Sequence, residues 1–206
     1  MTKPPRRRDA QATQARLLET ATREFARLGF AGARIDAIAD RAGVNKRMIY
    51  AYFEDKDGLY RAVLDVHLAR AFAVDGPAAT SARAQVERLL RGYFEFLAGH
   101  REFVRLLAWE ALSHEKRGRR LLIDRVAPAL APLHEVIRRG CAEGAFRADL
   151  EPRQLWMSVN AFFVGYFVQE PLVEALWETD LGTPRARNAT LTQFLRLLMD
   201  GIGATT

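Results

Sequence analysis

The sequence predicts an all-α protein of about nine helices, with a three-helix domain at the N-terminus and a larger helical domain after it. Three observations predict this fold class. Apolar residues recur every three or four positions along almost the whole chain, which is the period of a helix. No segment of useful length alternates apolar and polar residues as a half-buried strand would. Only 14 of the 206 residues are Gly and 8 are Pro, so few positions oppose helix formation.

The composition is that of a globular protein and excludes several classes. Hydrophobic residues make up 49% of the chain and charged residues 27%, which is too apolar for a disordered chain. A single cysteine, Cys141, excludes a disulfide framework, a cysteine zinc site and an iron–sulfur cluster. We therefore expect no metal and no cofactor. Cys141 is either a partly buried helix residue or, beside Arg138 and Arg139, a redox-sensitive thiol.

Charge and hydropathy point to nucleic acid and away from a membrane. Residues 1–56 carry 12 Lys/Arg against 7 Asp/Glu, whereas residues 57–206 carry 19 against 18. The excess positive charge therefore lies in the first quarter of the chain, as in a nucleic-acid-binding module. The longest apolar run, residues 155–168, is short and interrupted by polar residues. No apolar stretch follows the basic N-terminus, so we expect no signal peptide and a cytoplasmic protein.

The N-terminal region divides into an arm and four helices. Residues 1–8 hold two prolines and three arginines; we predict a basic flexible arm, which is either a solvated tail or touches DNA. Helical periodicity then begins at Asp9 and stops at Gly29. Two short helices follow, at about 36–42 and 46–53. Asn45 is a suitable N-cap for the second, and the pair Glu54-Asp55 caps a longer helix that starts near Lys56.

The remaining chain predicts five more helices. Their apolar stripes lie within residues 86–97, 103–110, 122–143, 152–168 and 191–202. Gly144 ends the third of these five, and Pro184 precedes the last. The predicted domains are therefore an arm at 1–8, an N-terminal domain at 9–55 and a C-terminal domain at 56–206.

The two short helices form a helix–turn–helix pattern. Four residues, Ala42-Gly43-Val44-Asn45, join them, and Gly43 can take the positive φ that a sharp turn needs. The second helix of such a unit lies in the DNA major groove with its N-terminal residues at the base edges. Those residues here are Lys46, Arg47 and Met48. The cations can donate to guanine acceptors, and the methionine can contact a thymine methyl group.

Four motifs in order within residues 25–59 carry a resemblance to a known family. They are Phe-x-x-x-Gly-Phe, Ile-Ala-x-x-Ala-Gly-Val, Ile-Tyr-x-Tyr-Phe and Lys-x-x-Leu. The segment resembles the TetR family of bacterial transcriptional regulators, and the rest of the chain fits that family by length and helical content. The resemblance implies a homodimeric, sequence-specific transcriptional regulator. It further implies a repressor that a small, largely apolar or aromatic ligand releases from a palindromic operator.

The resemblance also implies which residues contact DNA. Tyr50 and Tyr52 match positions that bind backbone phosphates, and Lys56 matches a lysine at a helix N-terminus that does the same. The expected DNA-binding residues are Arg34, Asn45, Lys46, Arg47, Met48, Tyr50, Tyr52 and Lys56. Arg34 stands where the family has a capping Thr or Ser, so one capping bond is lost. Alternatively, the two tyrosines are core aromatics, and Lys46 and Arg47 belong to a solvated face.

The resemblance places a dimer face on the last two helices and a ligand pocket in the C-terminal domain. The apolar stripes of those helices predict a dimer interface of Trp156, Phe162, Tyr166, Leu191, Phe194, Leu195, Leu198 and Ile202. Aromatic and polar residues nearby predict a pocket lined by His67, Phe94, Phe103, Leu107, Trp109, Glu110, Asn160 and Phe163. For each aromatic the alternative is ordinary core packing, and for His67 a histidine satisfied inside the protein.

Two other classes of function are alternatives to a regulator. An enzyme is not expected, because the chain has no Gly-rich phosphate loop, no HExxH and no GxSxG motif. Its four histidines are scattered along the sequence. An architectural DNA-binding protein without an effector is the other alternative. A footprint on a palindrome that a metabolite relieves would distinguish a regulator from such a protein.

Overall fold

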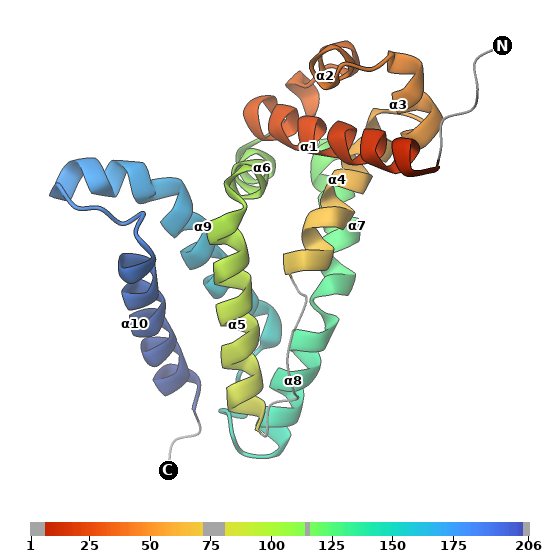
Figure 1. Cartoon of the computed structure of the whole chain (residues 1–206). Coiled ribbons are helices and arrows are strands. Elements are labelled where there is room, and N and C mark those ends of the chain that lie inside the picture. Colours follow the sequence, from red (N-terminus) through yellow and green to blue (C-terminus); the bar gives the residue numbers. More distant parts are fainter. Residues whose placement is uncertain (1–6, 72–80, 114–115, 204–206) are drawn as a thin grey trace. The chain divides into compact units, whose positions relative to one another are not determined.

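The computed structural model describes residues 7–71, 81–113 and 116–203. These segments form ten α-helices, and no β-strand occurs among them (Figure 1). An isolated bridge between Phe146 and Gly203 is their one β-type pairing. The predicted all-α class is therefore confirmed. None of the described helices is long and apolar enough to cross a membrane.

The helices group into two compact units. The first comprises Met1–Leu68 and Glu102–Val126, and the second comprises Ala69–Arg101 and Ala127–Thr206. The first unit therefore extends well past residue 55, where the sequence predicted a domain boundary, because it includes most of the fourth helix and two later ones. The boundary at residue 55 remains a prediction.

The first unit begins with four helices: α1 (Arg7–Gly32), α2 (Ile35–Ala42), α3 (Lys46–Phe53) and α4 (Lys56–Ala71). Because α1 starts at Arg7, the last two residues of the predicted arm are helical and its first six lie outside the described residues. Gly29 was predicted to stop α1. It takes a left-handed φ of 68° and kinks the helix, and helical hydrogen bonding resumes for three more residues.

The core of the first unit is aromatic where α1 meets α4. The Tyr60 ring lies edge-on to Phe25 and Phe30, at centroid distances of 4.9 and 5.0 Å. Ile38 of α2 and Ile49 of α3 are completely buried. The same unit also holds most of α6 (Arg101–Leu112) and of α7 (Lys116–Ala129). The small helices α2 and α3 are thus anchored to longer ones through apolar side chains.

The sequence predicted one helix over residues 122–143, and this prediction is wrong. Two helices occupy the region, α7 and α8 (Ala131–Ala142), with a break at Leu130. Pro132 stands in the first turn of α8. A proline inside a helix lacks the amide proton and clashes with the carbonyl four residues before it. A new helix can instead begin at a proline, and the apolar period continues unbroken across the turn.

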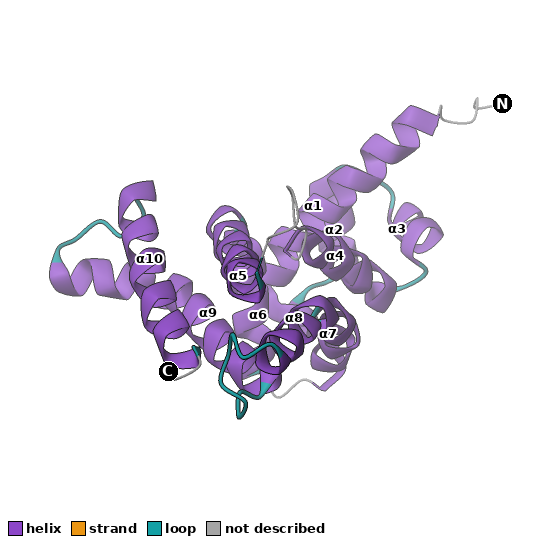
Figure 2. Ribbon diagram, turned by 90° about the horizontal axis from the view of Figure 1, so that it is seen from below, coloured by secondary structure: helices purple, strands orange, loops and turns teal. Residues whose placement is uncertain are grey.

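The second unit is built around α5 (Ala82–Gly99). It contacts α8, α9 (Pro152–Trp177) and α10 (Pro184–Ile202) (Figure 2). The rings of Phe94 and Phe163 meet edge-on between α5 and α9 at 5.0 Å, and both side chains are buried. Thr183 caps α10 by accepting a hydrogen bond from the Ala186 amide. Aromatic residues thus fill the interior of this unit.

Candidate nucleic-acid interface

The turn between α2 and α3 has the geometry that the sequence predicted. Gly43 takes φ 64° and ψ 38°, the left-handed conformation. Its amide and that of Val44 donate to the carbonyls of Asp40 and Ala39, each at 3.1 Å. Ala39 is buried and has a side chain small enough for the second helix to cross close to it. The arrangement is a helix–turn–helix.

The N-caps of both helices of this motif agree with the prediction. Asn45 is extended, and its side-chain oxygen accepts a 2.9 Å hydrogen bond from the Arg47 amide. Arg34 at the start of α2 is also extended, and its side chain makes no capping hydrogen bond. The N-terminal turn of α3 is therefore fixed by a side chain, and that of α2 is not.

Most of the predicted DNA-contacting side chains of α3 reach solvent. Lys46 and Arg47 are exposed, and Met48 and Tyr52 are half-buried. Tyr50 is 47% exposed, which rules out the alternative that it is a core aromatic. Ile49 and Phe53 point inward and anchor the helix. One face of α3 is thus exposed and could lie against the floor of a DNA groove.

Lys56 has a more constrained position than the sequence suggested. Its Nζ atom donates to the carbonyl of Ala31 at 3.2 Å and lies 4.8 Å from the centroid of the Phe30 ring. The side chain is half-buried. It therefore ties the end of α1 to the N-terminus of α4, where free amides and the helix dipole favour an anion.

Sequence reasoning missed a charged cluster that holds α2 on α1. Glu24 is buried and pairs with Arg27 on its own helix at 3.2 Å. It also pairs with Arg41 of α2. A carboxylate with two guanidinium partners can remain charged when buried. The available signal was an acidic residue set among Leu17, Ala21 and Leu28 on the apolar stripe.

The predicted ligand-pocket residues lie in both packing units. The first unit holds His67, Phe103, Leu107, Trp109 and Glu110, and the second holds Phe94, Asn160 and Phe163. That they line one pocket stays a prediction. Within its unit, His67 stacks on Phe103 at 5.1 Å, and its Nε2 lies 3.4 Å from the Thr22 hydroxyl. These contacts place His67 as a buried side chain packed inside the first unit.

Trp109 and Glu110 both connect α6 to helices of the first unit. The Trp109 indole donates to the Ala26 carbonyl at 3.1 Å. Its ring covers the kink, because a Cβ added to Gly29 would lie 3.2 Å from it. Glu110 is buried and accepts a 2.7 Å hydrogen bond from the Tyr60 hydroxyl. Burial and the neighbouring carboxylate raise the pKa of Tyr60.

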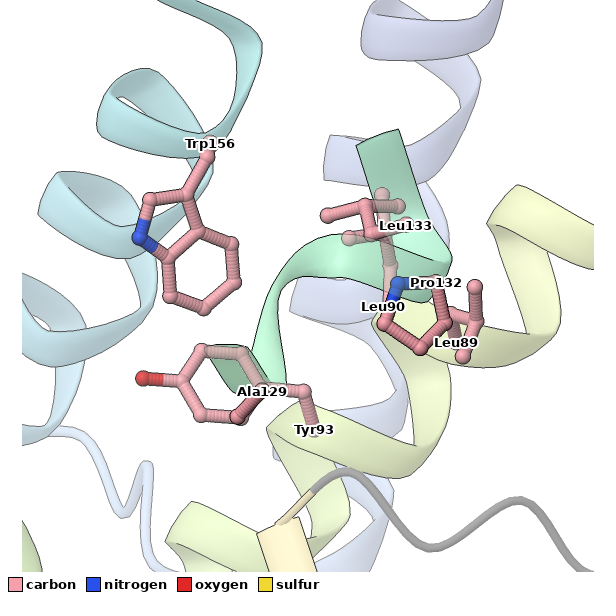
Figure 3. Close-up of a pocket in the computed structure, with 7 residues that line it drawn as sticks. All are labelled: Leu89, Leu90, Tyr93, Ala129, Pro132, Leu133 and Trp156. Atoms are coloured by element: carbon pink, nitrogen blue, oxygen red, sulfur yellow. The ribbon is translucent and has the colours of Figure 1, made fainter. Parts of the chain in front are cut away.

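A small cavity lies within the second unit, beside the middle of α5 (Figure 3). It is lined by Leu89, Leu90, Tyr93, Ala129, Pro132, Leu133 and Trp156. At about 20 Å³ it has room for roughly one water molecule. None of the eight predicted pocket residues lines it. Tyr93 donates to Asn160 Oδ1 at 2.8 Å, which supplies the partner that Asn160 needs.

A second charged cluster that sequence reasoning missed lies in the second unit. The buried carboxylate of Glu170 pairs with Arg101 and, at 3.4 Å, with Arg187. The Arg101 guanidinium also lies 4.5 Å from the centroid of the Phe167 ring. These contacts join the start of α6 to α9 and α10. The available signal was Glu170-Pro171, directly after a long apolar segment.

Part of the predicted dimer face is corrected by the structure. Leu191, Leu195 and Ile202 are buried within the subunit, because their side of α10 packs inside the unit. They are not available to a partner. The other five predicted residues are Trp156, Phe162, Tyr166, Phe194 and Leu198, which keep some exposure. Phe162 and Phe194 stack at 4.0 Å and join α9 to α10.

An exposed apolar stripe, which the sequence did not single out, follows α9. It consists of Met157, Ala161, Val168, Leu172 and Leu176. Their spacings of four and seven residues place them on one helix face. Exposed apolar patches often mark sites of interaction with a partner.

Fold and turn geometry together define a helix–turn–helix protein with a helical C-terminal region. The family model described as "Bacterial regulatory proteins, tetR family" matches residues 17–63. The model described as "Tetracyclin repressor-like, C-terminal domain" matches residues 83–197, more than half of the chain. The chain belongs to the tetR family of bacterial regulatory proteins. The predicted family and fold class are confirmed.

Relatives with assigned roles are transcriptional regulators. The HTH-type transcriptional repressor SCO4008 of Streptomyces coelicolor is 43% identical over 110 residues, 52% of this chain and 54% of its own. This match thus spans about half of that repressor's length. The HTH-type transcriptional repressor NicS of Pseudomonas putida is 29% identical over 96% of this chain and 95% of its own. The HTH-type transcriptional regulator RutR of Escherichia coli is 28% identical over 96% and 93%.

Solved structures share the fold across nearly the whole chain. The fatty acid degradation regulator FadR of Bacillus halodurans superimposes with a TM-score of 0.73 at 19% identity, covering 91% of this chain and 98% of that one. The putative transcriptional regulator SCO4942 of Streptomyces coelicolor gives 0.69 at 24% identity, covering 94% and 99%. At these identities the likeness shows the fold alone.

Proposed function

We propose that this chain is a dimeric transcriptional repressor that binds a palindromic DNA operator and is released by a small, largely apolar or aromatic ligand. The observation that carries the DNA-binding part is the helix–turn–helix of α2 and α3. Its second helix is capped at Asn45 and exposes Lys46, Arg47 and Tyr50 on one face. Such a face can place donors at base edges and at phosphates together.

Dimerisation is supported by the exposed apolar stripe on α9 and by Leu197 on α10, which is 67% exposed. A two-fold dimer buries the same patch on both subunits. It also presents two recognition helices to two half-sites, which suits a palindrome. We place the interface on this stripe with Phe162 and Leu197, and not on Leu191, Leu195 or Ile202.

The proposal that a small ligand releases the DNA is supported by the apolar and aromatic residues of the C-terminal region. The second unit has an aromatic interior, in which the Phe94 ring contacts both Phe163 and Phe167. It also has a small apolar cavity beside Tyr93 and Trp156. Apolar surroundings of this kind favour an apolar or aromatic ligand. A cavity of about 20 Å³ would have to widen to admit one. The ligand can shift DNA binding only through its different affinities for two conformations.

A regulator of this kind acts by binding and not by catalysis, and it acts where the chromosome is, in the cytoplasm. The membership of a family of bacterial regulatory proteins supports both statements. Turnover of a metabolite by the purified protein would contradict the first. Recovery of the native protein outside the cytoplasmic fraction would contradict the second.

Selection from a random-sequence duplex library followed by footprinting tests the DNA-binding proposal. The wild-type protein is expected to enrich a palindrome and protect it as one site. With about six to ten phosphate contacts, affinity should fall ~10³–10⁵-fold between about 50 and 200 mM salt. Failure to enrich any sequence would overturn the proposal. Added metabolites that change neither DNA binding nor melting temperature would overturn only the effector part.

Two substitutions separate base contacts from phosphate contacts. Arg47→Ala should cost ~1–3 kcal/mol of operator binding and relax the preference at one base pair. Lys56→Ala should weaken all duplexes alike and flatten the salt dependence, because it removes a phosphate contact. The measurement is a titration of each variant with the selected palindrome and with single-base variants of it. If both substitutions weaken every duplex equally, the assignment of Arg47 to bases is wrong.

A further inference from the structure

A hollow beside the start of α3 carries carboxylates as well as cations. It is lined by Asp36, Ala39, Asp40, Val44, Asn45, Lys46 and Arg47. Two acidic and two basic side chains therefore share this surface. Electrostatic attraction to DNA phosphates requires cations only, and the first 56 residues carry a clear excess of them. The two carboxylates weaken that attraction at the place where bases would be contacted.

The Asp36 carboxylate accepts a hydrogen bond from Lys46, one of the residues predicted to contact bases. Lys46 Nζ donates to Asp36 Oδ1 at 2.9 Å, from the first turn of α3 to the first turn of α2. The backbone beneath Lys46 is fixed, because the Asn45 cap holds the next amide. The hydrogen bond to Asp36 raises the pKa of Lys46, so the side chain stays charged while it is paired.

This ion pair has little value for folding. The two side chains are 56% and 64% exposed, and exposed pairs of this kind contribute little to the free energy of unfolding. The main effect of the ion pair is to restrict the positions that the Lys46 ammonium group can reach. An unpaired lysine is a flexible point charge that can neutralise any phosphate within reach. A lysine hydrogen-bonded to Asp36 is restricted to the hollow.

Building on the proposed function, we propose that Asp36 is a positioning residue that determines DNA specificity by directing Lys46 to a base and away from phosphates. The carboxylate repels phosphates, and it accepts hydrogen bonds only from donors, such as the amino group of cytosine. Lys46 donates to the O6 and N7 acceptors of guanine. The pair therefore presents one donor and one acceptor side by side, which a G·C base pair in the major groove complements.

A merely structural role for Asp36 makes a different prediction. A carboxylate in the first turn of a helix is stabilised by the helix dipole, and Asp36 occupies that position in α2, whose cap is missing. In that case its removal would lower the melting temperature and leave the preference between DNA sequences unchanged. Specificity and salt dependence are therefore the readouts that separate the two roles.

The test compares Asp36→Asn with three other variants on two duplexes. The first duplex is the one selected by the wild-type protein, and the second is a scrambled duplex of the same length. Asp40→Asn removes the same charge from the same hollow and leaves the Lys46–Asp36 bond in place. Lys46→Ala, alone and combined with Asp36→Asn, shows whether Asp36 acts through Lys46. Dissociation constants are measured over a range of salt, and circular dichroism checks folding.

Asp36→Asn should bind the scrambled duplex several-fold more tightly and the selected duplex no more tightly, so that the ratio of affinities falls ~10-fold. The salt slope on the scrambled duplex should steepen by about 0.9 per lysine released to a phosphate. The preference for G·C should weaken at one base pair of each half-site. Asp40→Asn should tighten both duplexes alike. In the Lys46→Ala background, Asp36→Asn should leave the ratio unchanged.

Two results would overturn the inference while leaving the proposed function intact. One is an equal change of the affinity ratio in Asp36→Asn and Asp40→Asn, which would make the effect one of charge alone. The other is an undiminished effect of Asp36→Asn without Lys46. If the wild-type protein enriches no sequence, the proposed function fails, and the inference fails with it.

Discussion

The hydrogen bond from Tyr60 to Glu110 joins α4 to α6 by two side chains buried in the first unit. Space for the carboxylate depends on a glycine, since a Cβ on Gly118 would lie 2.7 Å from Glu110 Oε1. A buried carboxylate is costly unless it is hydrogen-bonded. Tyr60 therefore has two roles, one as an aromatic of the core and one as a donor.

Tyr60→Phe should keep the ring packing and lower the free energy of unfolding by about 1.5–3 kcal/mol, the value of a hydrogen bond to a charged group. The folded-state pKa of Tyr60 is raised above its ordinary value of 10.0. Its contribution to stability is thus complete below about pH 10 and is lost as the pH rises further, because the unfolded tyrosine ionises first. Above about pH 10, wild-type protein should lose stability with rising pH more steeply than the variant.

Denaturant unfolding at several pH values measures both effects. Tyr50→Phe is the control, because the Tyr50 side chain is exposed and its hydroxyl should contribute little to the free energy of unfolding. Equal alkaline slopes for wild type and Tyr60→Phe would show that the buried hydrogen bond does not control this dependence.

The eight-residue helix α3 depends on its ends more than a long helix does. An isolated helix of this length is unstable in water. Here Asn45 satisfies an N-terminal amide, and Ile49 and Phe53 bury the inner face. Local capping and tertiary packing together hold the face that we propose contacts DNA.

Asn45→Ala should lower the free energy of unfolding by ~1 kcal/mol. It should also weaken DNA binding on every sequence, because the fraying first turn carries Lys46 and Arg47. Asn188→Ala removes an exposed asparagine from α10 and should change neither quantity appreciably. Urea unfolding and DNA titration of the two variants are the measurements. A loss of DNA affinity with Asn188→Ala as large as that with Asn45→Ala would contradict this role of the cap.

At the scale of the whole molecule, most of the exposed large apolar side chains of the described residues lie on α9 and α10. Leu195 is buried in the subunit, so an aspartate there would disturb folding and could not test the interface. Leu197 is on the opposite, exposed side of the same helix. It is therefore the better position for a charge that blocks association without unfolding the subunit.

Leu197→Asp should shift the protein from dimer to monomer and abolish operator binding at nanomolar concentration, with little change in helix content. The reason is that a charge buried in an apolar interface lacks both water and a partner. Leu112→Asp is the matched control, since Leu112 is 81% exposed on α6. Sedimentation velocity measures the assembly of both. An intact dimer of Leu197→Asp would place the interface elsewhere.

The sequence alone determined the helix–turn–helix, because its signals are local. A glycine in a left-handed turn, an asparagine cap and apolar residues at helical spacing each act within a few residues. The split into α7 and α8 is local too, since it depends on Pro132, but the unbroken apolar period masked it. At this position the proline, which lacks an amide proton, determines where the helix breaks, and the apolar period does not.

Only the tertiary structure decided which face of each C-terminal helix lies inside and which polar residues are buried. Periodicity identifies an apolar stripe but not what covers it, so Leu195 and Leu197 could be told apart only once α10 was packed. Glu24, Glu110 and Glu170 are buried by contacts with residues from other helices. The pairing of Lys46 with Asp36 likewise depends on how α2 and α3 cross. Such contacts join residues that are distant in sequence, and their energies depend on burial and geometry that no local pattern specifies.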